Sequence, residues 1–293
     1  MATQVKLIEG VKEIIQDSVF TSARILDYLN QAVRQIAGGM FIVYPNGTQI
    51  FSSPLPDLAT NSNLTTSTTL PYISMPSDYG RNLFFLVSST NEIEIILYDS
   101  YAEFMRAYPN LDATNRVIAA VVRGKLLYYQ GYPSSAETLV AYYNRLPFDM
   151  DTITGATDIS FAATTNRISD AGLGLGIFHA GQTIDVTGTT NNNDTLTVSS
   201  VAATGAYMDV DEDLTTEANT SAVIKSRPDG IPIHLHEALL ENYAAWQIFQ
   251  RKTKNDVPMD AEAKRYHGLF LGAMISMEAS IDDLPGSIQI TNG

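Results

Sequence analysis

The chain has 293 residues, of which 45% are hydrophobic and 17% are charged, and its formal net charge is −14. This length suits one large domain or two modest ones. Because the chain has no cysteine, disulfides and cysteine-ligated zinc are excluded, and the absence of a basic cluster argues against tight DNA binding. The sequence shows no secretory signal and no apolar run long enough to span a membrane, so we expect folding in a reducing cytoplasm, with no membrane partner.

Residues 1–39 have helical periodicity. Apolar residues recur at spacings of three and four from Val5 to Ile15, and again in the series Ile25, Leu29 and Val33. Gly38-Gly39 is expected to end the second helix. Residues 45–70 are rich in Pro, Ser, Thr and Asn, which predicts a long polar loop.

The middle of the chain predicts strands. Apolar or alternating runs cover residues 83–87, 92–97, 117–122, 126–129 and 138–146. Ser100 and Glu103 form a capping-box pattern, which predicts one short helix over Tyr101–Tyr108.

Residues 149–226 differ in composition from the sequence on either side. They are rich in Thr, Gly, Ala and Asp, and the stretch from Asp149 to Ile224 holds eleven acids and one base, a net charge of −10. Strand-like runs over 182–187, 195–201, 206–210 and 222–226 alternate with turn signals. This spacing predicts a small β-sandwich or β-barrel.

Helical periodicity returns after this stretch, over residues 235–249 and 263–281. We therefore predict an α+β fold, in which the N- and C-terminal helices form a helical bundle with a β side layer. A small all-β module, a barrel or a sandwich, is inserted into this core. The predicted domains are a core of 1–148 and 227–281, an acidic β-module of 149–226 and an extended tail of 282–293.

No pattern of catalytic, cofactor-binding or metal-binding residues is complete. The glycine run from Gly172 to Gly176 is followed by Ile177, where a dinucleotide fingerprint needs glycine. The run from Asp209 to Asp213 begins like a calcium loop but has Leu214 at the glycine position. We therefore expect no enzyme and no cofactor. Four acids of the run from Asp209 to Asp213 form a candidate acidic patch, which would either dock a fibre or nozzle protein or keep neighbouring subunits apart: Asp209, Asp211, Glu212 and Asp213.

Three segments together resemble the head-to-tail adaptor (connector) proteins of tailed bacteriophages, especially of short-tailed types. They are the helix Ile25–Ala37, the middle run from Met75-Pro-Ser-Asp-Tyr79 to Tyr142–Pro147, and the helix pair after Ile231-Pro232. The inserted stretch resembles a β-module of phage head and tail proteins, through Gly181–Gly188 and Asn193–Val201. Gln182 stands where that module usually has Asp.

The resemblance implies a structural virion protein, assembled in the host cytoplasm and located at the neck. It implies a ring of about twelve copies beneath the portal protein. The ring would surround a channel through which DNA passes without specific binding, and it would carry tail nozzle or fibre proteins. The alternative is a receptor- or glycan-binding tail or fibre component that uses the β-module.

The C-terminal residues suggest a docking segment. Pro285 ends the last predicted helix, and Ile288 and Ile290 then alternate with polar residues. We expect these three residues to dock on the portal or on a neighbouring copy, by adding a strand to its sheet. A disordered end is the other interpretation.

Overall fold

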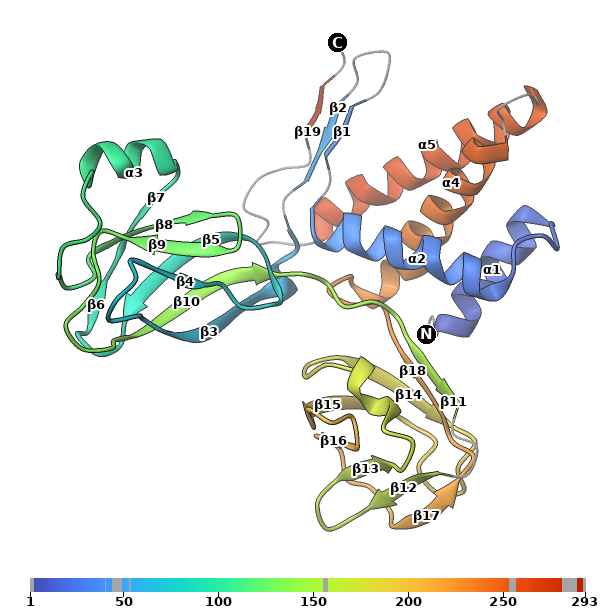
Figure 1. Cartoon of the computed structure of the whole chain (residues 1–293). Helices are drawn as coiled ribbons and strands as arrows, with labels where there is room; N and C mark the ends of the chain where they lie inside the picture. Colours follow the sequence, from blue (N-terminus) through green and yellow to red (C-terminus); the bar gives the residue numbers. More distant parts are fainter. Residues whose placement is uncertain are drawn as a thin grey trace. The chain divides into compact units, whose positions relative to one another are not determined.

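Figure 1 shows a computed structural model of the chain. It describes residues 3–39, 41–43, 49–52, 54–154, 158–252, 257–280 and 289–291. The chain divides into two compact units: unit 1 comprises residues 1–55 and 147–293, and unit 2 comprises residues 56–146. The predicted domain bounds place the module of 149–226 apart from the helices, and they remain a prediction. No helix in the described ranges is long and apolar enough to cross a membrane.

The predicted fold class, a helical bundle with a β side layer and a small inserted β-module, is wrong. The described residues form four β-sheets, one of them with eight strands, and five α-helices of 7–24 residues. The chain is therefore mainly β structure. The prediction failed because several strands are short and polar, such as β17 (Glu217–Thr220), and read as loops in the sequence.

The two N-terminal helices of unit 1 begin at threonine caps. In α1 (Gln4–Ile15) the Thr3 hydroxyl accepts a hydrogen bond from the backbone N–H of Lys6, at 3.4 Å. In α2 (Ser22–Ala37) Thr21 has the same role toward Arg24, at 3.3 Å. The predicted apolar face of α2 is confirmed, since Ile25, Leu29, Ala32, Val33 and Ile36 are all buried.

The C-terminal helices pack on this pair. The chain passes through η3 (Ile233–Leu235) and a π-helix, η4 (Glu237–Glu241), into α4 (Asn242–Lys252). Helix α4 contacts α1, α2 and α5 (Val257–Ser280). Rings of Tyr243 and Phe270 join α4 to α5, with centroids 5.4 Å apart. The π-turn widens the backbone, and both Leu239 and Leu240 are buried.

Residues 152–226 of unit 1 form the eight-stranded sheet, in the order β11-β18-β14-β15-β16-β13-β12-β17. Alternate residues of its strands enter one apolar cluster, which contains Phe161 of β12 and Ile224 of β18. Because strands from distant places in the order share this cluster, the sheet curls around it. The remaining strand bounds are β11 (Thr152–Thr154), β12 (Ile159–Ala162), β13 (Arg167–Asp170), β14 (Thr183–Thr187), β15 (Thr195–Val201), β16 (Tyr207–Val210) and β18 (Val223–Ser226).

Unit 2 consists of two four-stranded sheets around a shared core. One sheet has the order β3-β10-β5-β6 and the other β4-β9-β8-β7. Leu86 and Tyr143 from the first sheet pack with Leu127 and Tyr129 from the second. The bounds are η1 (Pro56–Leu58), β3 (Ala59–Thr65), β4 (Tyr72–Ser74), β5 (Tyr79–Ser88), β6 (Ile93–Glu94), β7 (Ile96–Tyr98), α3 (Tyr101–Ala107), β8 (Ala119–Arg123), β9 (Leu126–Tyr129) and β10 (Thr138–Arg145).

Two local expectations in unit 2 need correction. The predicted loop of 45–70 is wrong over β3, which pairs with β10 along its whole length. Helix α3 forms where the capping box predicted it, but Ser100 makes no side-chain cap hydrogen bond. The turn Arg123-Gly124-Lys125 joins the antiparallel strands β8 and β9, and Gly124 has the positive φ of +64° that favours glycine.

Candidate functional site

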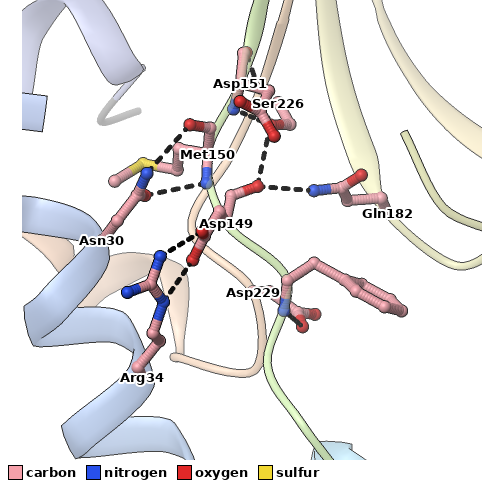
Figure 2. A network of polar contacts seen from close by, with 9 residues as sticks. Asn30, Arg34, Asp149, Met150, Asp151, Gln182, Ser226 and Asp229 are labelled. Carbon is pink, nitrogen blue, oxygen red and sulfur yellow. Dashed lines mark hydrogen bonds and ion pairs between the residues drawn. The ribbon is translucent and has the colours of Figure 1, made fainter. Parts of the chain in front are cut away.

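A polar junction joins helix α2 to the chain that enters the eight-stranded sheet (Figure 2). Asn30 lies on α2 and is 8% exposed. Its amide nitrogen donates to the carbonyl oxygen of Met150 at 3.1 Å, and its amide oxygen accepts from the N–H of Met150 at 2.8 Å. One side chain therefore satisfies both polar groups of a buried residue, which fixes the strand entrance on the helix.

One helical turn further on, Arg34 binds Asp149 through two parallel hydrogen bonds (Figure 2). The bond from Nε to Oδ1 is 2.7 Å long. The hydrogen bond to Asp149 raises the pKa of the Arg34 guanidinium, against the opposite effect of burial. The ion pair is partly exposed, with 58% and 35% of the two side chains accessible, so its contribution to stability is modest.

Gln182 connects the same segment to the sheet. It is 1% exposed, and its amide nitrogen donates to the carbonyl oxygen of Asp149 at 3.0 Å. Its amide oxygen accepts from the N–H of His179 at 3.1 Å. A carboxylate can only accept hydrogen bonds, so an ionised Asp could not make the bond to Asp149. The amide of Gln182 meets this requirement, because it both donates and accepts.

The sheet side of the junction is closed by Ser226 at the end of β18. Its hydroxyl accepts from the N–H of Asp151 at 2.7 Å. Burial, followed by the nearby charge of Asp149, raises the pKa of the Asp151 carboxyl. The groups of the junction are chiefly matched donors and acceptors. The junction is suited to holding the sheet on the helices.

The four acids of the candidate patch lie together on β16 and the turn after it, and three of them bind neighbouring residues, Asp213 by accepting from the amide nitrogen of Asn166 at 3.4 Å. Asp209 forms an ion pair with Arg167, with Nε to Oδ1 at 2.7 Å, and this contact lowers the pKa of its carboxyl. Glu212 accepts from the N–H of Thr197 at 2.7 Å. Asp211 and Asp213 remain exposed. The outward negative charge of the patch is therefore concentrated on these two residues.

Of the candidate docking residues at the C-terminus, Pro285 and Ile288 lie outside the described residues. Ile290 lies in β19 (Gln289–Thr291), which pairs antiparallel with β2 (Gln49–Phe51) of the same chain. Strand β2 also pairs with β1 (Phe41–Val43). The tail thus completes a three-stranded sheet within the chain, and its docking on a portal or neighbour remains a prediction.

The glycine-rich run is explained by an internal carboxylate. Asp170 accepts from the N–H groups of Gly172 and Gly174, each at 2.8 Å. A side chain on Gly174 would press against this carboxylate, so the glycine gives the acid room. Backbone N–H groups that could cradle a phosphate are already satisfied by Asp170.

The histidines are dispersed. His234 is exposed in η3, while His236 is 2% exposed and its Nε2 lies 2.8 Å from the carbonyl oxygen of Ile231. His179 stacks on Phe148, with ring centroids 4.2 Å apart. Within the part of the chain that the structure describes, no group of three or more histidines or acids could hold a metal ion.

Sequence reasoning did not identify Glu241, the last residue of the π-helix. Burial, and then the charges of Glu237 and Glu13, raise the pKa of its carboxyl to about 7. Its carboxylate lies against Gly10 of α1, where an added Cβ would collide with it. Glu241 lines a groove of about 780 Å³ with Glu13, Glu262, Lys252 and Arg265. No sequence signal indicated this residue, because a π-turn shifts the side-chain directions that a regular helix would give.

No known family model matches this chain, and no curated protein is significantly similar to it.

Proposed function

We propose that the chain is a structural, non-enzymatic subunit of a tailed-bacteriophage particle, one copy of an adaptor ring beneath the portal. In this role the ring offers a channel for DNA and a platform for tail nozzle or fibre proteins. The protein then belongs to the virion neck, after assembly in the host cytoplasm. This proposal rests on the resemblance of three segments to the adaptor family.

The packing of two of the resembling segments against each other supports the proposal most strongly. Two of the resembling segments, Ile25–Ala37 and the helices after Ile231-Pro232, are far apart in the sequence but pack together as α2 and α4. The Tyr243 hydroxyl of α4 donates to Oε1 of Gln35 on α2 at 2.7 Å. The segments therefore contribute to one packed body, as they must if their likeness reflects a common subunit design.

The surface of unit 2 adds support. Six large apolar side chains in its 91-residue span are exposed: Leu70, Phe84, Phe85, Ile96, Ile118 and Leu146. These exposed apolar side chains are available for contact with other protein surfaces. Such contacts are expected of a subunit that functions within a permanent homo-oligomer.

The mass of the full-length protein in solution tests the proposal. We expect light scattering after size exclusion, with the portal protein of the same phage present, to give a complex that contains a ring of about twelve chains. A chain that stays monomeric beside the portal at high concentration would contradict the ring. Binding of the same monomer to host surface polysaccharide would then favour the receptor-binding alternative.

A further inference from the structure

The glycine-rich loop of the eight-stranded sheet presents apolar side chains to solvent. The loop joins β13 to β14 and contains Leu173 and the short helix η2 (Gly174–Ile177). Leu175 is buried in the apolar cluster of this sheet, whereas Leu173 is 56% exposed and Ile177 is 39% exposed. Among the residues described for 152–226, these two are the large apolar side chains that stay exposed. We call the pair Leu173 and Ile177 the apolar knob.

The backbone of Leu173 is held in a conformation that is unfavourable for a bulky residue. Its φ is +58°, in the left-handed region. Its N–H donates to the carbonyl oxygen of Asp170 at 3.2 Å, and the Asp170 carboxylate binds the N–H groups of both flanking glycines. On the other side, a Cβ added to Gly205 would lie 2.5 Å from the Leu173 carbonyl oxygen. The surroundings therefore fix the strained backbone, and strain of this kind is concentrated at functional sites.

The apolar knob lies in neutral segments of an otherwise acidic stretch. Residues 171–184 and 195–208 contain no Asp, Glu, Lys or Arg, although the stretch from Asp149 to Ile224 has a net charge of −10. The two neutral segments meet where the N–H of Leu175 donates to the carbonyl oxygen of Gly205 at 3.1 Å. A partner can therefore cover these segments without removing an ionised side chain of theirs from water.

Unit 2 contains a cavity of about 410 Å³ between the end of α3 and the start of β8. Its lining includes Tyr108, Pro109 and Ile118, and Ile118 is 44% exposed. Gln130, also in the lining, is 4% exposed. Its amide oxygen accepts from two backbone N–H groups at 3.3 and 3.1 Å, and its amide nitrogen donates to the carbonyl oxygen of Arg116. Because this buried amide is engaged by its own backbone, the Ile118 cavity offers chiefly apolar contact to an occupant.

We propose that the apolar knob of one copy of the chain inserts into the Ile118 cavity of a second copy, with Leu173 packed against Ile118. The knob is convex, apolar and held rigidly, and the cavity is concave and accessible through an exposed isoleucine. Among the described residues that line the cavity, only Arg116 is charged, and its charge is opposite to that of the stretch that carries the knob. Such charge complementarity orients the two copies as they meet.

This inference rests on the proposed ring and specifies one contact between its copies. The knob belongs to unit 1 and the cavity to unit 2, so each copy uses two different surfaces. A contact between unlike surfaces repeats from copy to copy and closes into a ring when the rotation allows. A side chain that fills a pocket of its partner is also expected to contribute much of the binding energy of an interface.

Substitutions of Leu173 in the full-length chain test the contact by light scattering with the portal protein present. Asparagine is favoured at positive φ, so Leu173→Asn should keep the wild-type melting temperature. It should raise the concentration needed for half-maximal assembly by roughly tenfold or more, because the partner pocket loses its apolar occupant. Leu173→Met keeps an apolar side chain at the same position, is the matched control and should assemble normally. Leu173→Asn assembling as the wild type does would overturn the inference.

A substitution in the cavity shows whether the two surfaces bind each other. Ile118→Asp places an acid where the acidic stretch of the next copy approaches, and it should weaken assembly by roughly tenfold as well. Residues in contact do not contribute independently, so the double variant of Leu173→Asn with Ile118→Asp should assemble about as poorly as either single variant. Losses that multiply in the double variant would place Leu173 and Ile118 in separate contacts and would refute the proposed pairing.

Thiol cross-linking tests the same contact without requiring complete rings. Because the chain has no cysteine, a protein with Leu173→Cys mixed with a protein with Ile118→Cys should oxidise to a dimer of the two. Lys125→Cys, at the exposed turn between β8 and β9, replaces Ile118→Cys in the control. Equal cross-linking in both mixtures, or none in either, would refute this contact. Rings that form without it would leave the proposed function standing, whereas a wild-type chain that never assembles would refute both.

Discussion

At the scale of single residues, the Asn30 side chain binds both the N–H and the carbonyl group of Met150. Asn30→Ala removes both partners of Met150, whose side chain is fully buried, and leaves its N–H and carbonyl groups unsatisfied. We expect the free energy of unfolding to fall by about 2–4 kcal/mol. Urea unfolding followed by circular dichroism measures the change.

Asn63→Ala provides the control for that experiment, because Asn63 is exposed on β3. It should change the free energy of unfolding by no more than about 0.5 kcal/mol. If both alanine variants unfold at the same urea concentration as the wild type, the junction does not contribute to stability in the way described.

The residues of this junction gave little signal in the sequence. Asn30 and Arg34 were visible only as polar positions of a predicted helix, and their partners are 120 and 115 positions away. The acidic run Asp209–Asp213 was recognisable from its composition. In the structure, Asp209 binds Arg167 and Glu212 binds a backbone N–H. Both contacts depend on strand pairing, which a count of charges cannot reveal.

At the scale of elements, the contact of the π-helix η4 with helix α1 through Glu241 predicts that the stability of the protein depends on pH. The folded protein raises the pKa of Glu241 to about 7, above the value near 4.3 of an unfolded glutamate. The stabilising contribution of its neutral form is therefore complete below about pH 4 and is lost as the pH rises through 7. The groups around it are Glu13, Glu237, Glu262, Lys252 and Arg265.

Glu241→Gln tests this dependence because the amide stays neutral at every pH. We expect the variant to lose less thermal stability than the wild type between pH 5 and pH 8. Glu9→Gln, an exposed position of α1, should keep the wild-type decline. Parallel melting-temperature profiles for Glu241→Gln and the wild type would show that this carboxyl does not titrate in the expected range.

Elements with strong periodicity were predicted well, and those specified by distant pairing were not. Helix α2 follows from the three-and-four spacing of its apolar residues. Strand β3 has one buried residue, Leu64, among polar neighbours, and its strand form follows from pairing with β10. Because polar strands of this kind resemble loops in the sequence, the predicted share of helix exceeds the share that the structure contains.

At the scale of the whole molecule, charge predicts weak DNA binding. The net charge is −14, and Arg34, Arg167, Arg227 and Lys252 already pair with carboxylates. The sequence has no basic cluster that could release several counterions from a duplex at once. Fluorescence anisotropy with labelled DNA at 50 mM salt should show a Kd weaker than roughly 10⁻⁴ M. Tight binding that weakens steeply with salt would contradict a channel through which DNA slides.

The central claim, a ring beneath the portal, is tested most directly by electron microscopy of the full-length chain mixed with the portal protein of the same phage. We expect averaged end views to show a closed ring of about twelve copies with an open centre, and side views to show that ring attached to one end of the portal. Bare portals beside single chains, or chains extended into fibres, would contradict the account.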